Sequence, residues 1–259
     1  MSAARAKGRL RAVGVIPARY GSTRFPGKAL ADVAGKPMIQ RVYERAAAAG
    51  RLDGLYVATD DQRIYDAARK FTADVVMTAA EHPSGTDRVA EVATQLEADV
   101  FVNIQGDEPL IEPAAIDAAV GPFDADAAVL MTTLARPIPR ERRAELADPH
   151  ACKVVVDRAG DALYFSRAVI PYRHHRGITL PYLRHVGVYG FRRDFLLRFT
   201  ALEPTPLEAA EGLEMLRALA HGFKIRVVTG DFASRGVDTP EDLAPVVDFY
   251  LRGGDDDKG

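Results

Sequence analysis

The sequence indicates an α/β protein with a Rossmann-like, mostly parallel, twisted sheet that carries helices on both faces. Short Val- and Ile-rich runs alternate with segments in which apolar residues recur at helical spacing. Gly and Pro stand at the ends of many of these segments, where loops are expected. The length of 259 residues allows one large α/β domain or two small ones.

The first half of the chain is expected to consist of repeated strand, loop and helix units. Residues 12–16 form an apolar run that ends at Pro17, as in a strand buried on both faces of a parallel sheet. Apolar residues at helical spacing predict a helix over 38–49, which Gly50 stops. Further strands are expected at 55–58, 73–77 and 99–104, and further helices at 61–71 and 86–96. Such alternation gives right-handed βαβ units and a mostly parallel sheet.

The pattern is less regular in the second half. The segment 166–181 is polar and rich in Pro, Arg and His, which predicts an excursion that leaves the main sheet. It should return as an antiparallel edge strand at 185–191. A last helix should begin at the cap Thr239 and the first-turn residue Pro240. The other expected elements are strands at 127–133, 153–156 and 224–228 and helices at 140–147 and 207–220.

We expect three parts in the chain. Residues 1–11 form a basic N-terminal arm, residues 12–251 form a single α/β domain, and residues 252–259, with three consecutive Asp, form a disordered tail.

Composition and charge exclude several classes of protein. With 34 Lys and Arg against 36 Asp and Glu, the net charge of −2 provides no basic field for nonspecific nucleic-acid binding. The single Cys152 excludes an intrachain disulfide and a multi-thiolate metal site. No apolar run approaches the ~18 residues needed to span a bilayer. We therefore expect a cytoplasmic protein without a membrane or nucleic-acid partner.

A cationic loop follows the first predicted strand. Residues 17–28 combine two glycines with hydroxyl and cationic side chains, namely Ser22, Thr23, Arg19, Arg24 and Lys28. Backbone N–H groups beside glycines, together with cations, suit a polyphosphate. The spacing is not that of a Walker A loop, because Ala29 stands where that loop has its magnesium-binding hydroxyl. An ordinary solvated basic loop is the alternative.

Carboxylates follow two other predicted strands. Asp107 and Glu108 come directly after the strand at 99–104, and Asp238 follows the strand at 224–228. Ligands of open α/β sheets collect at the carboxyl ends of strands, and Mg²⁺ usually takes one or two protein carboxylates. A capped turn before Pro109 and a helix N-terminus after Asp238 are the structural alternatives.

A fourth loop, at 82–88, contains Ser84, Gly85 and Thr86 before a predicted helix. Its backbone and side chains suit a phosphate or a base edge. The alternative is a plain helix cap at Thr86.

Five motifs occur in one order along the chain: IPARYGSTRFPGK at 16–28, SGTDR at 84–88, QGDEP at 105–109, YFSR at 164–167 and GVDTP at 236–240. Together they resemble the 3-deoxy-manno-octulosonate cytidylyltransferases, also called CMP-Kdo synthetases. The resemblance covers nearly the whole chain, from Val13 to Leu251. It implies a fold of the nucleotide-diphospho-sugar transferase type and usually a homodimer, with the smaller excursion used for dimerisation.

The resemblance also implies an activity. Enzymes of this family make CMP-Kdo and pyrophosphate from CTP and Kdo with Mg²⁺, for lipopolysaccharide biosynthesis. Residues 12–125 would then be the nucleotide-binding half, and residues 126–251 the sugar-binding and dimerisation half.

Family roles can be carried onto matching positions of this sequence. Nucleotide contacts fall on Ala18, Arg19, Ser22, Arg24, Lys28, Ser84, Gly85 and Asp107. The metal carboxylates fall on Asp107 and Asp238. Sugar-acid contacts fall on Gln105, Arg167, His185, Tyr189 and Glu214. The expected catalytic residues are Arg19, Lys28, Asp107 and Asp238.

Two positions depart from the family pattern. Met215 stands where relatives tend to have Gln, which replaces an amide that can bond a sugar hydroxyl with a thioether that hardly can. Ala79 stands where some members have Arg. The alternatives are a cytidylyltransferase for another acidic sugar, such as a sialic acid or amino-Kdo, and a non-catalytic nucleotide-binding protein.

Overall fold

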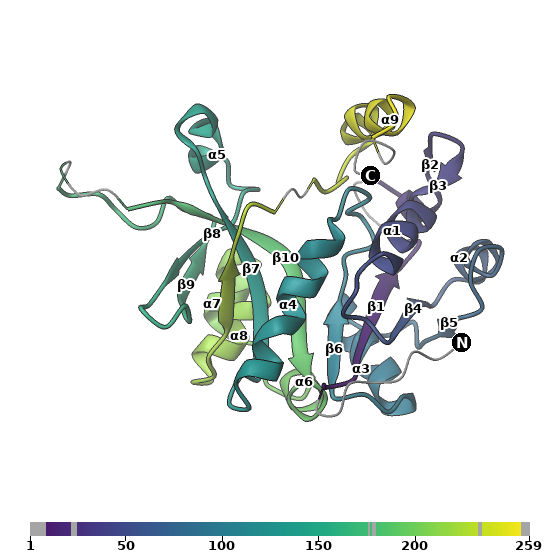
Figure 1. The fold of residues 1–259 in the computed structure, drawn as a ribbon, viewed down its shortest axis with the longest axis horizontal. Helices are drawn as coiled ribbons and strands as arrows, with labels where there is room; N and C mark the ends of the chain where they lie inside the picture. The colour runs from purple at the N-terminus through teal and green to yellow at the C-terminus, as the bar shows by residue number, and fades with distance from the viewer. Residues whose placement is uncertain (1–8, 22–24, 176, 178–179, 233–234, 255–259) are drawn as a thin grey trace. The chain divides into compact units, whose positions relative to one another are not determined.

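The computed structural model describes residues 9–21, 25–175, 177, 180–232 and 235–254, which form two compact units (Figure 1). The first unit comprises Leu10–Asp117 and the C-terminal segment from Ala233. The second comprises Ala118–Phe232 and the N-terminal residues to Arg9. The boundary between these compact units falls at 117/118, and the C-terminal segment belongs with the first unit. Most of the predicted arm (1–8) and of the predicted tail (255–259) lies outside the described residues.

The first unit contains a parallel sheet with β1 (Ala12–Ala18) at its centre (Figure 1). β1 pairs on one side with β6 (Val100–Asn103) and on the other with β4 (Gly54–Thr59), which pairs with β5 (Val75–Met77). Val15 and Ile16 point to opposite faces of the sheet, yet both are fully buried. Both faces of β1 are therefore covered, as the apolar run in the sequence predicts.

Three helices pack on this sheet. α1 (Met38–Ala47) and α3 (Gly85–Gln95) contact β1, and α2 (Gln62–Ala68) contacts β4 and β5. The predicted strands and helices of this unit are confirmed, and their ends differ by no more than a few residues. The short hairpin of β2 (Asp32–Val33) and β3 (Lys36–Pro37) was not predicted, nor was the 3-10 turn η1 (Lys28–Leu30).

Helix α4 (Pro113–Ala125) was also not predicted, and its residues from Ala118 onward belong to the second unit. The pair Gly121 and Pro122 usually marks a turn, yet both lie inside the helix. The buried apolar side chains of α4 stabilise the helix in spite of this local signal.

The second unit is built around β7 (Met131–Pro137). β11 (Arg226–Thr229) pairs with it in parallel, and β10 (Leu183–Arg192) pairs with it antiparallel. β10 also pairs with β8 (Lys153–Val156), which in turn pairs with β9 (Ala162–Ser166). The antiparallel direction predicted for 185–191 is confirmed, but its edge position is wrong because β10 has a neighbour on each side.

Several predictions for the second unit need correction. The strand expected at 127–133 begins only at Met131. The helix expected at 140–147 is a 3-10 turn, η2 (Arg140–Arg142), followed by one turn of α-helix, α5 (Ala144–Ala147). The long helix expected at 207–220 is two helices, α7 (Pro206–Glu211) and α8 (Met215–Ala220). Gly212, which adopts the left-handed conformation with φ of 60°, ends α7. Strand β9 and helix α6 (Arg193–Thr200) were missed.

The C-terminal segment packs on the first unit through a small apolar cluster. Val237 and Val246 are buried with Val33 and Met38, and Tyr250 donates a hydrogen bond to Pro109 O at 2.6 Å. The predicted start at Thr239 is confirmed, since η3 (Pro240–Asp242) leads directly into α9 (Leu243–Leu251).

The turn that opens η3 is closed by one carboxylate. Asp242 Oδ2 accepts hydrogen bonds from Asp238 N at 3.0 Å, Thr239 N at 2.8 Å and Thr239 Oγ1 at 3.1 Å. The bond from Thr239 N is the main cause that lowers the pKa of Asp242. This turn fixes the backbone of Asp238 at the end of the extended segment.

A substitution in β10 tests the packing of the second unit. In register with Gly190 lies Thr132, whose Oγ1 donates to Ala119 O at 2.7 Å. A Cβ atom on Gly190 would lie 2.5 Å from Thr132 Oγ1 and 2.7 Å from the ring of Phe123. We expect Gly190→Ala to lower the free energy of unfolding in urea by about 1–3 kcal/mol.

Gly50→Ala is the matched control, because its nearest neighbour, Asp117 Oδ2, lies at an ordinary 3.6 Å. We expect this control to change the free energy of unfolding by no more than about 0.5 kcal/mol. Equal effects of the two substitutions would contradict the packing argument.

Candidate functional site

A cavity of about 410 Å³ lies in the first unit. Its walls come from the end of β1, the turn η1, the loop before α3, the turn after β6 and the segment before η3. This place is the carboxyl edge of a parallel sheet, where open α/β proteins bind ligands. The lining residues are Pro17, Ala18, Arg19, Lys28, Ala29, His82, Pro83, Ser84, Gly85, Arg88, Gln105, Gly106, Asp107 and Asp238.

Lys28 joins the two predicted metal carboxylates. Its ammonium forms an ion pair with Asp107 Oδ2 and lies 3.7 Å from Asp238 Oδ1. It also donates to Val237 O at 3.3 Å, while Val237 N donates to Asp107 O at 2.8 Å. Lys28 and Asp238, more than 200 positions apart in the sequence, thus meet in the lining of the cavity.

The base of the cationic loop is closed by Tyr20 and Gly27. Gly27 N donates to Tyr20 O at 2.9 Å, and Gly27 has φ of 72°, which favours glycine. The Tyr20 ring lies under the guanidinium of Arg63, 3.3 Å from the ring centroid. Arg19 is exposed at the cavity wall. Ser22 and Arg24, both expected to bind nucleotide, lie outside the described residues.

The turn after β6 lies against the backbone of β1. A Cβ atom on Gly106 would come within 2.8 Å of Pro17 O, so only glycine fits this close approach. The neighbouring Gln105 lines the cavity, and its Nε2 donates to Asn103 Oδ1 at 3.3 Å. Glycine at this position places Gln105 and Asp107 directly beside the end of β1.

Helix α3 begins two residues earlier than it would if Thr86 were its cap. Ser84 is its cap, since Ser84 Oγ accepts from Asp87 N at 3.2 Å and donates to Asp87 Oδ2 at 2.6 Å. Thr86 is buried and accepts a hydrogen bond from Asn103 Nδ2 at 3.2 Å. Ser84 and Gly85 therefore line the cavity at the helix N-terminus, while Thr86 ties the helix to β6.

The donor set suits Mg²⁺. The side chains of Asp107 and Asp238 are 29% and 47% exposed, so each has oxygen atoms open to a ligand. Both already stabilise one cation, the Lys28 ammonium. Within the described ranges, no three His, Cys, Asp or Glu side chains form a metal site by themselves. Such a partial site is typical of Mg²⁺, which completes its shell with water and phosphate oxygens.

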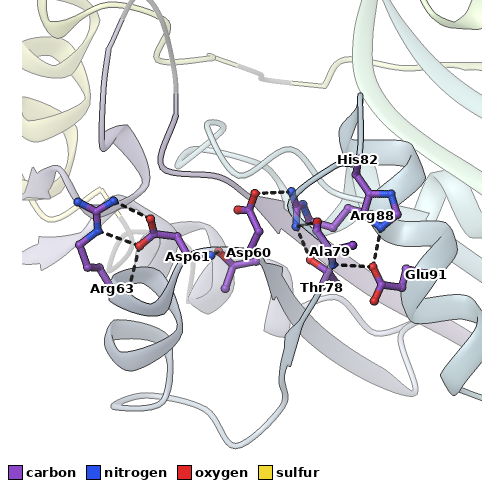
Figure 2. A network of polar contacts seen from close by, with 9 residues as sticks. Asp60, Asp61, Arg63, Thr78, Ala79, His82, Arg88 and Glu91 are labelled. Atoms are coloured by element: carbon purple, nitrogen blue, oxygen red, sulfur yellow. Dashed lines mark hydrogen bonds and ion pairs between the residues drawn. The ribbon is translucent and has the colours of Figure 1, made fainter.

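Behind the cavity wall lies a polar network that the sequence interpretation missed (Figure 2). Arg88 is only 3% exposed, and its Nη2 lies 3.1 Å from Asp60 Oδ2. Its Nη1 donates to Thr78 Oγ1, and also to Ala79 O at 3.2 Å. Asp60 directly follows β4, so its place at the carboxyl end of a strand was the available signal.

Four of the five predicted sugar-acid residues belong to the second unit. Arg167 is held by backbone carbonyls: its Nε donates to Glu211 O at 2.6 Å and its Nη1 to Pro149 O at 2.8 Å. Glu211 also accepts from Ser166 Oγ at 2.6 Å and from Arg167 N at 2.9 Å. Burial alone would raise the pKa of Glu211, but these hydrogen bonds outweigh it and lower that pKa.

His185 and Tyr189 lie together on β10. Their ring centroids are 5.4 Å apart, and Tyr189 Oη lies 4.0 Å from the sulfur of Met215. His185 Nε2 shares a hydrogen bond of 2.9 Å with Thr133 Oγ1. Glu214 directly precedes α8. Gln105, the fifth predicted contact, lies in the first unit.

A buried lysine under Arg167 was also missed. Lys153 is fully buried, and its Nζ donates to Arg167 O at 2.5 Å and to Asp148 O at 3.0 Å. Burial lowers the pKa of Lys153 and raises the pKa of its neighbour Cys152 to about 12. Cys152 is therefore a protonated core thiol.

No helix in the described part of the chain combines the length and apolar character needed to cross a membrane.

Comparisons with known proteins agree with this geometry. A family model described as cytidylyltransferase matches residues 13–225. A 3-deoxy-manno-octulosonate cytidylyltransferase from Solibacter usitatus is 57% identical, and the match covers 90% of this chain and 92% of the relative. One from Geobacter metallireducens is 53% identical, with 92% and 97% covered.

Solved structures confirm the fold class. The structure of CMP:2-keto-3-deoxy-manno-octonic acid synthetase complexed with CTP has a TM-score of 0.88 at 44% identity, covering 94% of this chain and 99% of that one. An inositol-1-phosphate CTP transferase from T. maritima shares the fold alone, with a TM-score of 0.65 at 15% identity and coverage of 96% and 98%.

Two adjacent aspartates allow a test of the buried network in Figure 2. We expect Asp60→Asn to lower the free energy of unfolding by about 2–4 kcal/mol, because it leaves the buried Arg88 charge without its counterion. Asp61→Asn should lower the free energy of unfolding by less than about 1 kcal/mol, because its partner Arg63 is 59% exposed and Asn can still cap α2. Urea denaturation of both variants measures the difference. A smaller effect at position 60 than at 61 would contradict the assignment.

His185 should make stability depend on pH. Burial, aided by Arg184, lowers the pKa of His185 to about 3. Between about pH 6.5 and pH 3 the unfolded chain then binds a proton that the native chain does not, so the free energy of unfolding falls as the pH falls. We expect His185→Gln to flatten this part of a urea-denaturation pH profile. The exposed His221→Gln is the control, and an identical profile for wild type and His185→Gln would contradict the prediction.

Proposed function

The chain belongs to the family of 3-deoxy-manno-octulosonate cytidylyltransferases, and on this basis we propose that it transfers CMP from CTP to the anomeric hydroxyl of Kdo. The products are CMP-Kdo, an activated sugar for lipopolysaccharide biosynthesis, and pyrophosphate. The observation that carries the proposal is the meeting of Lys28 with Asp107 and Asp238 at one end of the cavity. The Lys28 ammonium and the cationic loop suit the phosphates of a nucleoside triphosphate, and the two carboxylates suit its metal ion.

The reaction must bring negative charges together. The sugar carboxylate and the triphosphate repel each other, and at ~4 Å each like-charge pair costs ~4 kcal/mol at an effective dielectric constant near 20. We assign Arg19 and Lys28 to the phosphates, where they neutralise charge that is displaced toward the leaving pyrophosphate. Ala18, Ser84 and Gly85 line the same cavity and would contact the nucleotide through their backbone or hydroxyl groups. Ser22 and Arg24 are proposed for the same role on the resemblance of their motif.

Asp107 and Asp238 would hold Mg²⁺. The bound ion would offset the negative charge of the triphosphate and lower the pKa of the attacking hydroxyl. The two residues come from different parts of the chain, and Val237 N to Asp107 O at 2.8 Å sets their relative position. Positioning of the reacting groups by such rigid backbone contacts is the main catalytic contribution expected in phosphoryl transfer.

We propose that the second unit binds the sugar acid through Arg167, His185, Tyr189 and Glu214. Arg167 carries the positive charge for the carboxylate, and its orientation is fixed by carbonyls of Glu211 and Pro149. His185 is neutral at physiological pH and can hydrogen-bond a hydroxyl without adding charge. Gln105 is proposed as a further contact on the resemblance alone.

We further propose a cytoplasmic homodimer. The exposed apolar side chains of Val169, Tyr172 and Leu180 lie within the predicted excursion, and they support a protein partner there. The single, buried Cys152 supports a reducing compartment.

Pyrophosphate release tests both the activity and the metal assignment. With Kdo and Mg²⁺ present, we expect release from CTP in preference to ATP, GTP and UTP. Asp107→Ala and Asp238→Ala should each lower kcat/KM by about a hundredfold or more, because each removes half of the proposed metal site. Turnover comparable to the wild type in either variant would overturn the metal assignment.

Asp248→Ala is the matched control for these variants. Asp248 lies on α9 in the same unit, is 63% exposed and pairs only with Arg252 among the ion pairs of the described residues. The activity of this variant should equal that of the wild type.

Competition with a sialic acid or an amino analogue of Kdo tests which sugar the enzyme uses. Preferred use of either would overturn Kdo as the substrate.

A further inference from the structure

The residues that line the cavity come from two sets of elements, which we call its two walls. One wall carries the side chains of Arg19, Lys28, Asp107 and Asp238. The other is formed by His82, Pro83, Ser84, Gly85 and Arg88. Under the proposed function, on which this inference rests, the triphosphate and its metal ion occupy the first wall. The second wall is then left for the uncharged part of the nucleotide.

The charges behind the second wall disfavour a phosphate there. The Arg88 guanidinium is paired with Asp60 and bonded to Thr78 and Ala79, so its charge is already balanced (Figure 2). A second carboxylate, Glu91, lies against His82. Hydrogen bonds outweigh burial and lower the pKa of Glu91, so this carboxylate is ionised at neutral pH. A neutral heterocycle fits this wall better than an anion does.

The Glu91 carboxylate fixes which nitrogen of His82 carries a proton. Glu91 Oε2 lies 2.5 Å from His82 Nε2 and 2.9 Å from Ala79 N (Figure 2). An ionised carboxylate only accepts hydrogen bonds, so Nε2 must donate. In the neutral ring Nδ1 then carries a lone pair. Nδ1 makes no hydrogen bond to any residue that the structure describes.

The backbone around His82 is held on both sides. Ala79 N is bonded to the same Glu91 oxygen, and Ser84 caps α3 two residues after His82. The His82 side chain is 22% exposed and lines the cavity. In its neutral form, His82 therefore offers one acceptor atom, Nδ1, on a ring whose position is held by Glu91.

We propose that His82 is a specificity-determining residue that selects cytosine. Its Nδ1 accepts a hydrogen bond from the 4-amino group of the base, and Glu91 is a positioning residue that holds the ring in the required tautomer. Uracil has a carbonyl oxygen in place of this amino group, so two acceptors would face each other. A wall that offers an acceptor thus favours CTP and penalises UTP.

Binding measurements with three nucleotides test this role directly. The probes are CTP, UTP and the triphosphate of pyrimidin-2-one riboside, which lacks the 4-amino group, each titrated calorimetrically with Mg²⁺ and without Kdo. We expect wild type to bind CTP about five- to tenfold more tightly than the analogue, as one hydrogen bond allows. The His82→Ala variant should bind CTP and the analogue with equal affinity. Its ratio of CTP affinity to UTP affinity should be about tenfold lower than that of the wild type.

Two substitutions at Glu91 separate the tautomer from simple packing. Glu91→Gln keeps an oxygen that can accept from both His82 and Ala79, so it should retain most of the preference for CTP. Glu91→Ala should reduce the preference toward that of His82→Ala. His221→Ala is the matched control, since His221 is exposed and lies in the second unit. It should leave all three affinities unchanged.

Several results would overturn the proposal. These are a His82→Ala variant that weakens all three nucleotides equally or none of them, a His82→Ala variant that favours CTP more strongly than wild type, and a wild type that does not bind CTP. The third result would also refute the proposed function. Amino-dependent CTP binding without pyrophosphate release in the presence of Kdo would refute the proposed function and leave the role of His82 intact.

Discussion

The site depends on one electrostatic constraint, which is that two carboxylates from distant parts of the chain must be held close together. Asp107 and Asp238 would repel each other without a cation, and the Lys28 ammonium provides one. The fold supplies the remaining restraint through the backbone hydrogen bond from Val237 N to Asp107 O. The C-terminal segment carries Asp238. The packing of Val237 and Val246 in the apolar cluster therefore positions this carboxylate as well as stabilising the fold.

The same constraint explains why the first unit includes both early and late parts of the chain. The buried strand β1 ends beside the cavity, and Gly106 allows the turn after β6 to lie against Pro17 O. Asp107 is therefore placed by the turn after β6, and Lys28 is placed by the 3-10 turn η1. Asp238 is set by a turn that Asp242 closes with three hydrogen bonds. All three groups therefore lie in turns or short segments next to regular elements, where hydrogen bonds and close packing fix their positions.

A structural feature could be predicted from the sequence where a few neighbouring residues determine it. The apolar run at 12–16 specifies a buried strand because only a strand of that length between loops can bury every residue. The capping residues at 239–242 likewise act within one turn. The break at Gly212 also had a local signal, a glycine that caps α7, whereas the helix that continues through Pro122 depends on the burial of its apolar side chains. The sequence places Asp60 at the end of a strand, but its pairing with Arg88 could not be predicted because Arg88 lies on a different element.

In the second unit, charged groups gather around Arg167, which is proposed to bind the sugar acid. Lys153 and Arg167 place two cations near one carboxylate, Glu211, while the raised pKa of Cys152 and the lowered pKa of His185 keep both of these neighbours uncharged. Asp148 adds a second carboxylate beside Lys153, so the two cations of the cluster are balanced by two negative charges. Burying an unbalanced charge is costly, so this balance allows Lys153 to be fully buried beneath Arg167. The sequence suggests Arg167 through its motif, but only the structure reveals that a fully buried lysine fixes the backbone of that arginine.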